Sequence, residues 1–180
     1  MRKRSIQELN RKTPEAFKTA AKIPLILILD NVRSLYNIGA VFRTADAFLV
    51  DKIFLCGITA CPPHKDIHKT ALGATETVAW EYCKHTEDLV SKLLQQNIEV
   101  VAVEQTDTAT PLNHFKPEPG KRYAFVLGNE VKGVRQEVIN LLENSVEIPQ
   151  FGTKHSLNIA VAASIVLWDF FSKTQFLKTL

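Results

Sequence analysis

Cysteine is scarce in this sequence, and long hydrophobic runs are missing. Only three cysteines occur among the 180 residues, and an odd set of three argues against a disulfide framework. No uncharged apolar stretch approaches the roughly 20 residues that a membrane span needs. The first residues also lack the basic-then-apolar pattern of a signal peptide. We therefore expect a cytoplasmic protein with no membrane segment.

The glycine motifs of common nucleotide-binding proteins are absent as well. The sequence contains no G-x-G-x-x-G. Gly128 and Gly133 bracket a short turn, but Val134 and Arg135 follow in place of the Lys and Ser or Thr of a phosphate loop. Ordinary dinucleotide and nucleoside-triphosphate sites are thus excluded. The turn either precedes a helix without further role or holds an adenosine-like ligand.

A metal site is not indicated, although four zinc-competent side chains are grouped at Cys56, Cys61, His64 and His68. Only two residues separate Cys61 from His64, whereas a zinc finger needs roughly 12 to 15 between its ligand pairs. Cys56 also closes the apolar stretch KIFLC, where a small hydrophobic side chain fits. We expect a core cysteine with loop histidines, and no metal.

Positive charge is concentrated at the start of the chain. Residues 1–22 carry seven Lys or Arg and two Glu, a net charge of +5, whereas the remainder sums to −2. Thr13 followed by Pro14 is a typical helix start. The sequence predicts a basic N-terminal helical extension, 1–22, attached to a single domain, 23–180. Such a leader is either a solvated tail or an arm for an acidic partner such as nucleic acid.

The rest of the chain alternates between strand-like and helix-like segments. Apolar, β-branched runs predict strands at 23–30, 52–56, 77–82, 98–104, 122–128 and 145–149. Helical patterns lie at 37–48, at 86–96 with Thr86 as cap, and at 134–143. This order predicts an α/β fold with a mostly parallel sheet covered by helices on both faces. Ligands bind at the carboxyl ends of such strands.

Polar residues follow three of these strands. After the first, Asn37 is a plausible cap for a helix in which Arg43 lies over small residues, among them Gly39. A glycine inside a helix costs about 1 kcal/mol relative to alanine, so close approach by a ligand or by another backbone is expected there. A surface arginine over a helix-packing glycine is the alternative.

The last predicted helix raises a question of its own. Residues 159–168 carry no charge and are apolar on every side, which predicts a buried helix. Its entrance holds Lys154, His155, Ser156 and Asn158, although one cap would suffice and Ser156 could serve.

Three ordered motifs resemble those of the SpoU, or TrmH-like, RNA ribose methyltransferases of the SPOUT superfamily. They are NIGAVFRTADAF, LGNEVKGV and IPQFGTKHSLNIAVA, and the similarity runs from about Pro24 to Phe170. Gln150 stands in place of the common methionine, and Ala160 in place of the serine after the asparagine. Neither departure removes a polar group assigned to catalysis.

The resemblance implies an enzyme that uses S-adenosylmethionine to methylate a ribose 2'-hydroxyl of RNA. It also implies a C-terminal trefoil knot, which general topology rules would not suggest. By motif position it assigns catalytic and RNA-handling roles to Asn37, Arg43, Glu130, Ser156 and Asn158. It places four residues around the cofactor: Val103, Gly128, Ile148 and Leu157.

Because a guanidinium stays protonated at neutral pH, Arg43 is expected to act as a cation, with Glu130 and Asn37 orienting it. The proton acceptor is left open between Arg43 assisted by a phosphate and a water molecule. A catalytically silent RNA- or cofactor-binding module and a SPOUT base methyltransferase are the alternative functions.

The expected partners are RNA and a second copy of the chain. The short leader leaves no room for a separate RNA-recognition domain, which favours transfer RNA over ribosomal RNA as the substrate. The resemblance and the apolar final helix both point to a homodimer. The leader residues expected to hold RNA are Arg2, Arg4, Arg11 and Lys12.

Overall fold

The computed structural model describes residues 1–5 and 7–174. Residue 6 of the predicted leader and the last six residues of the predicted domain 23–180 lie outside this part of the chain. Seven strands form one sheet in the order β3-β2-β1-β6-β4-β7-β5, and every pair of neighbours is parallel. The strands are β1 (Ile23–Asp30), β2 (Val50–Cys56), β3 (Trp80–Cys83), β4 (Glu99–Val103), β5 (Thr110–Pro111), β6 (Tyr123–Leu127) and β7 (Asn144–Glu147).

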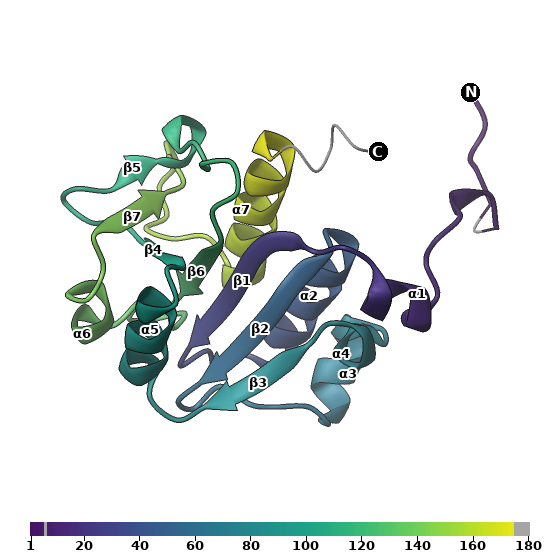
Figure 1. Cartoon of the computed structure of the whole chain (residues 1–180), viewed down its shortest axis with the longest axis horizontal. Helices are drawn as coiled ribbons and strands as arrows, with labels where there is room; N and C mark the ends of the chain where they lie inside the picture. The colour runs from purple at the N-terminus through teal and green to yellow at the C-terminus, as the bar shows by residue number, and fades with distance from the viewer. Residues whose placement is uncertain (6, 175–180) are drawn as a thin grey trace.

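Helices cover both faces of the sheet, so the predicted fold class is confirmed (Figure 1). The α-helices are α1 (Pro14–Thr19), α2 (Leu35–Ala47), α3 (Lys65–Ala71), α4 (Ala74–Thr77), α5 (Thr86–Gln95), α6 (Gln136–Ile139) and α7 (Ile159–Lys173). Two short 3-10 turns lie at Gln7–Leu9 and Leu112–His114. Alternate residues of β1 enter different cores: Leu27 packs with α2 and α7, and Ile28 packs with α5 and α6.

Several elements differ from the sequence prediction. Strand β5 and helices α3 and α4 were not expected, because each is too short for a clear periodicity. The predicted strand 77–82 is divided between the end of α4 and β3. Positive φ angles at Leu72 and Gly73 make the turn that starts α4, and only the glycine signals it in the sequence. The predicted helix 134–143 shrinks to Gln136–Ile139.

Two predicted helix caps are wrong. Helix α2 begins two residues before Asn37, because the side chain of Ser34 accepts a hydrogen bond from the Asn37 N–H and caps it. The Thr86 hydroxyl donates to the buried carboxylate of Asp30 at 2.6 Å, so it does not cap α5.

The prediction that the final helix is buried on every side is also wrong for the single chain. Helix α7 buries Ala163, Leu167 and Phe170 against the sheet. On its outer side Val161 is 48% exposed, Ile165 37% and Trp168 56%. An apolar strip therefore remains on the surface.

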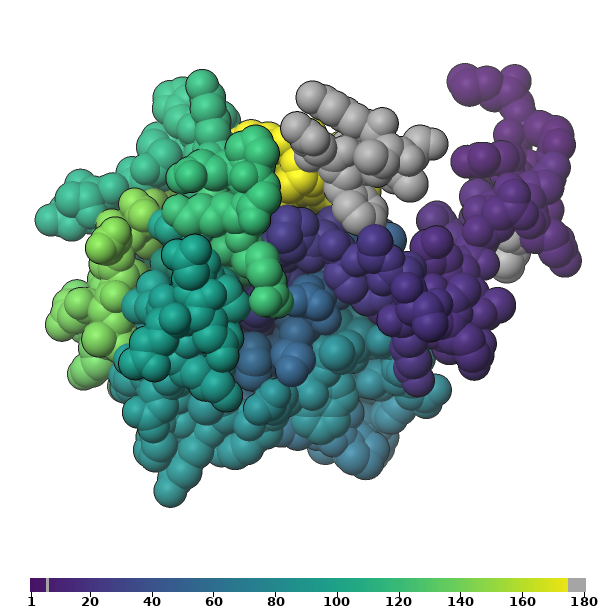
Figure 2. All heavy atoms as spheres, viewed as in Figure 1, coloured from purple at the N-terminus to yellow at the C-terminus, as the bar shows by residue number. Residues whose placement is uncertain are grey.

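The basic leader projects from one side of the domain (Figure 2). Its helix α1 begins as predicted, since the Thr13 hydroxyl accepts a hydrogen bond from Ala16 N at 3.2 Å. The division at residue 22 stays a prediction. Within the described residues, none of the helices has the length and apolar character to cross a membrane.

The segments that follow β1, β6 and β7 lie together at the carboxyl ends of the central strands. The loop from Ile148 to Asn158 leads from β7 into α7 and passes beside the turn 128–134. The trefoil knot implied by the resemblance stays a prediction.

Candidate functional site

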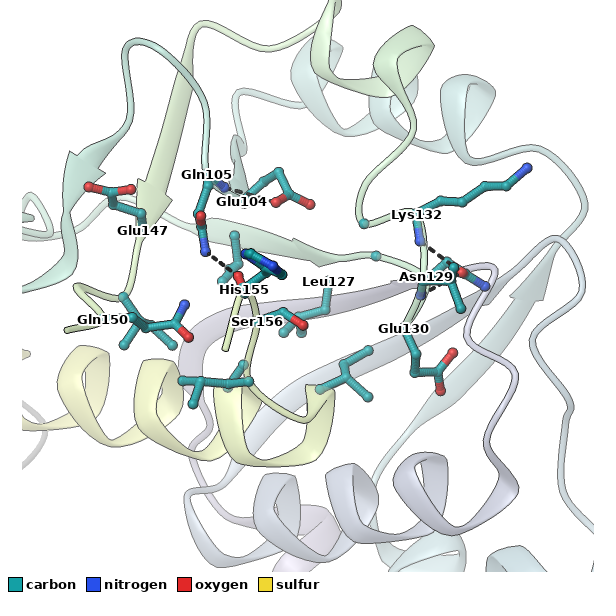
Figure 3. A pocket seen from close by; sticks show the side chains of 18 residues that line it. Glu104, Gln105, Leu127, Asn129, Glu130, Lys132, Glu147, Gln150, His155 and Ser156 are labelled. Atoms are coloured by element: carbon teal, nitrogen blue, oxygen red, sulfur yellow. Dashed lines mark hydrogen bonds between the residues drawn. The ribbon is translucent and has the colours of Figure 1, made fainter. Parts of the chain in front are cut away.

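A cavity of about 330 Å³ lies at the carboxyl ends of β4, β6 and β7 (Figure 3). This is where ligands bind in parallel α/β sheets, and the volume lies at the lower end of the range for small-molecule sites. The four residues predicted to surround a cofactor all line it: Val103, Gly128, Ile148 and Leu157. Glu130 and Ser156, predicted for catalysis, line the same cavity.

The turn 128–134 forms one wall and is folded tightly on itself. Asn129 and Gly133 exchange backbone hydrogen bonds at 3.0 and 2.8 Å. Gly133 has a φ of +67°, and a Cβ at Gly128 would lie 2.0 Å from the Gly133 carbonyl carbon. Both glycines are therefore needed for the shape of the turn. A side chain at Gly128 would displace the turn before it filled the cavity.

Glu130 joins this turn to the start of α2. Its carboxylate accepts hydrogen bonds from the backbone N–H groups of Arg33 and Ser34 at 3.0 and 2.9 Å, and from Asn37 Nδ2 at 3.3 Å. Partial burial raises the pKa of Glu130, but these donors outweigh it and hold the pKa below its ordinary value. Glu130 is therefore an ionised acceptor at neutral pH.

Asn37 and Asn158 connect the start of α2 with the mouth of α7. Asn158 Nδ2 donates to Asn37 Oδ1 at 3.1 Å, and Asn158 Oδ1 accepts from Ala160 N at 2.9 Å. Asn158, and not Ser156, is thus the N-cap of α7. The Ser156 hydroxyl makes no hydrogen bond within the described residues. At the polar mouth of α7, Asn158 therefore caps the helix and also links it to α2. The Ser156 hydroxyl beside the cavity remains free to bind a ligand.

Arg43 lies apart from the other predicted catalytic residues. It is exposed on α2, six residues beyond Asn37, which is about 9 Å along the helix axis. It lines a different cavity, between α2, α4 and the leader, which Arg11 and Lys12 also line. No hydrogen bond links Arg43 to Glu130 or Asn37, so their predicted role of orienting Arg43 is not supported within one chain.

Gly39 has a structural explanation. A Cβ on Gly39 would lie 2.3 Å from the Ile67 carbonyl oxygen, so α2 and α3 pack backbone to backbone at this residue. The close approach expected from the sequence is thus made by another helix.

The four leader residues predicted to hold RNA are placed differently from one another. Arg2 forms an ion pair with Glu8 at 2.6 Å, which lowers the pKa of Glu8 to about 2. Arg11 and Lys12 face the cavity that Arg43 also lines. Arg4 is exposed and has no ion pair within the described residues. Arg2 is therefore the least available of the four for a phosphate.

No metal site forms in the described part of the chain, where no three His, Cys, Asp or Glu side chains are grouped suitably. Cys56 is buried in the core, which raises the pKa of its thiol to about 12. His64 Nδ1 accepts a hydrogen bond from Asp66 N and caps α3. A core cysteine with loop histidines is what the sequence predicted.

Among the cavity residues that sequence reasoning missed are Glu104, Gln105 and Glu147. All three stand at or just past the ends of β4 and β7, and that position was the available signal. The Glu147 side chain makes no hydrogen bond or ion pair within the described residues. With Glu104 and Glu130 it places three carboxylates around the cavity, against the single lysine Lys132.

The fold and the cavity define the class: a parallel α/β domain with an acidic small-molecule site at the ends of its strands. The chain belongs to the SpoU rRNA Methylase family, and the sequence model of that family matches residues 24–168. S-adenosylmethionine is the cofactor of this family.

Two curated relatives illustrate the family. The chain is 29% identical over 153 residues to the 23S rRNA (guanosine-2'-O-)-methyltransferase RlmB of Neisseria meningitidis, a match that covers 85% of this chain and 60% of that protein. It is also 29% identical to the tRNA (guanosine(18)-2'-O)-methyltransferase of Aquifex aeolicus, over 81% of this chain and 67% of that protein. The chain thus spans about three fifths of the length of the first relative.

A solved structure supports the same fold. The AdoMet-bound rRNA methyltransferase of Sinorhizobium meliloti is 25% identical and has a TM-score of 0.76, over 87% of this chain and 58% of that one.

The residues around the cavity fit S-adenosylmethionine. Its sulfonium and ammonium groups outweigh its carboxylate, so the molecule is a cation, and three cavity carboxylates against one lysine complement that charge. Val103, Leu127 and Ile148 form an apolar wall, a surface that suits a flat aromatic group such as adenine. The cofactor assignment from the resemblance therefore agrees with the chemistry of the cavity.

Proposed function

We propose that this protein transfers a methyl group from S-adenosylmethionine to a ribose 2'-hydroxyl of RNA. The single observation that supports it most is the shared cavity. The second and third motifs supply Gly128, Glu130, Ile148, Ser156 and Leu157 to one acidic site. Asn37 of the first motif is joined to this site by hydrogen bonds with Glu130 and Asn158. The curated relatives carry guanosine-2'-O-methyltransferase names, one for ribosomal RNA and one for transfer RNA.

The cavity residues divide the work between binding and positioning. S-adenosylmethionine, when bound, supplies an electrophilic methyl group. Val103, Ile148 and Leu157 would enclose it and exclude water, while the turn 128–134 would fix its orientation by backbone contacts. Positioning of this kind is worth roughly 7 to 11 kcal/mol in a displacement reaction. The free hydroxyl of Ser156 is available to hold the reacting ribose.

Arg43 would bind the phosphate next to the reacting ribose and stabilise the developing alkoxide. Arg43 does not line the cavity of its own chain. A second copy of the chain offers a solution, because Arg43 lies one turn from Ala40, which lines the apolar groove beside the exposed strip of α7. We propose that Arg43 serves the cavity of the partner subunit.

A homodimer would also cover the exposed strip. Val161, Ile165 and Trp168 form an apolar surface with Ala40 and Ala160, and such surfaces mark association sites. A second copy on this strip would sit beside the mouth of α7. The family resemblance, which implies pairing of subunits near the knot, supports the same arrangement.

The RNA substrate is a transfer RNA or a ribosomal RNA, and its negatively charged phosphates suit the basic leader. Arg4, Arg11 and Lys12 would hold backbone phosphates, and the protein would act in the cytoplasm.

Mapping of 2'-O-methyl groups in total RNA from wild type and from a strain lacking this gene tests the proposal. We expect one or more ribose methyl groups to disappear from transfer or ribosomal RNA. Identical ribose methylation in the two strains would contradict it, and loss of a base methyl group would favour the base methyltransferase instead.

A further inference from the structure

Side-chain hydrogen bonds form a closed ring around the cavity. Four segments contribute: the residues just after β4, the loop before α7, the start of α2 and the turn 128–134. Two of the links are already described, since Asn158 joins α2 through Asn37, and Asn37 joins the turn through Glu130. The ring is closed by two neighbouring residues, Glu104 and Gln105.

Glu104 holds the turn 128–134. Its Oε2 accepts a hydrogen bond from Val134 N at 2.9 Å, and its Oε1 accepts from Gln105 N at 2.9 Å. The carboxylate lies directly against Gly133, where a Cβ would come within 2.0 Å of Oε2. Both oxygens are thus committed to backbone donors, and the turn cannot move outward without breaking the Val134 bond.

Gln105 holds the loop before α7. Its Nε2 donates to the His155 carbonyl oxygen at 3.0 Å, and the pair faces the cavity (Figure 3). This contact matters because residues 151–158 are all exposed and no backbone hydrogen bond from their own N–H groups is made within the described chain. Within the described part of the chain, Gln105 is the only side chain that forms a hydrogen bond with the loop between Pro149 and Asn158.

We propose that Glu104 and Gln105 are positioning residues that hold the two cofactor-lining loops at the separation the cofactor needs. The identity of the ligand rests on the proposed function, whereas the anchoring of the two loops rests on the hydrogen bonds alone. Ser156 and Leu157 follow His155 directly, so the Gln105 bond restrains two neighbouring residues that line the cavity. Because the two loops are then ordered before the cofactor binds, the entropic cost of ordering them does not weaken the affinity.

The test combines limited proteolysis with cofactor binding, on the full-length chain. Trypsin cuts after Lys154, beside the anchored His155, and exposed loops are the preferred sites of nicking. In the ligand-free protein, Gln105→Ala should speed cleavage after Lys154 by about 3- to 10-fold, the loss expected for one hydrogen bond. Cleavage after Arg11 and Lys12 in the same sample serves as an internal reference and should not change.

Calorimetry with S-adenosylmethionine then measures the consequence for binding. Gln105→Ala and Glu104→Gln should each weaken affinity by about 3- to 10-fold. Gln136→Ala is the matched control, because Gln136 donates to Asn140 at 2.8 Å on the surface of α6, away from the cavity. It should leave both the cleavage and the affinity at wild-type values.

Each outcome decides one part of the proposal. Unchanged cleavage after Lys154 in Gln105→Ala would overturn the anchoring role of Gln105. Faster cleavage with unchanged affinity in both variants would overturn the positioning role toward the cofactor. If the wild-type protein fails to bind S-adenosylmethionine, the proposed function fails, whereas the cleavage comparison still decides whether Gln105 anchors the loop.

Discussion

At the scale of single residues, Arg43 carries the clearest prediction. The alanine variant should lower methyl transfer by about 100-fold or more, because a cation that stabilises developing charge is lost. Arg43→Lys should also be poor, since a point charge does not reproduce the planar guanidinium. Affinity for S-adenosylmethionine should not change, because Arg43 does not line the cofactor cavity. Near wild-type turnover by the alanine variant would remove Arg43 from the mechanism.

Glu130 predicts a dependence of stability on pH. Its pKa lies below the ordinary value of about 4.3, so its stabilising contribution is complete above that pH and is lost as the pH falls through the lowered pKa. Glu130→Gln should therefore be less stable than wild type at pH 7, and the difference should shrink below about pH 4. Urea unfolding at pH 7 and pH 3.5 measures it. A difference that stays constant between the two pH values would contradict the carboxylate role.

At the scale of elements, the cap of α7 separates folding from catalysis. Asn158→Ala should destabilise the protein by about 1 kcal/mol, since Ala160 N and Val161 N lose their acceptor. Asn158→Asp keeps an acceptor but loses the donor to Asn37, so it should unfold like wild type and yet transfer methyl groups more slowly. Ser156→Ala is the control for the cap and should leave thermal unfolding unchanged. Equal stability of Asn158→Ala and wild type would rule out the cap.

The elements also show how far the sequence alone can lead. Strands with β-branched runs, such as Ile23–Asp30, were predictable because burial on both faces leaves a continuous apolar signal. The short helix Ala74–Thr77 was not, because its start depends on the left-handed Leu72, which no residue preference reveals. The positions of Gly128, Ile148 and Leu157 in one cavity were predictable from motifs, whereas that of Gln105 was not. Its role depends on a contact 50 residues away, with the His155 carbonyl.

At the scale of the whole molecule, the exposed strip on α7 predicts a dimer. Trp168→Glu should give a monomer, because a charge on the strip would be buried without a partner. Leu94→Glu is the matched control, since Leu94 is 40% exposed on α5 on the other side of the sheet. Light scattering at micromolar concentration measures the mass. A wild-type monomer, or an intact Trp168→Glu dimer, would contradict the assignment of this surface.

Mixed dimers test whether Arg43 acts across the subunit interface. Arg43→Ala and a cavity variant such as Leu157→Arg are each expected to be inactive. If Arg43 serves the partner's cavity, mixing the two variants creates one intact site in each mixed dimer and restores about a quarter of the activity. No activity after subunit exchange would mean that Arg43 serves its own chain.

The leader predicts a dependence of RNA binding on salt. Removing residues 2–12 deletes five lysines and arginines, so the slope of log affinity against log salt should become less steep. Affinity for S-adenosylmethionine should stay the same, because none of these residues lines the cofactor cavity. Filter binding across a salt series measures the slope, and an unaltered slope would exclude the leader from RNA binding.

The position of the transferred methyl group tests the central claim most directly. The purified protein is incubated with S-adenosylmethionine labelled in its methyl group and with bulk transfer and ribosomal RNA from a strain lacking the gene. The RNA is then hydrolysed in alkali and the products are identified by mass. We predict label in dinucleotides that resist cleavage, because a 2'-O-methyl group blocks attack on the neighbouring phosphate. Label found only in mononucleotides would show methylation of a base and would contradict ribose methylation.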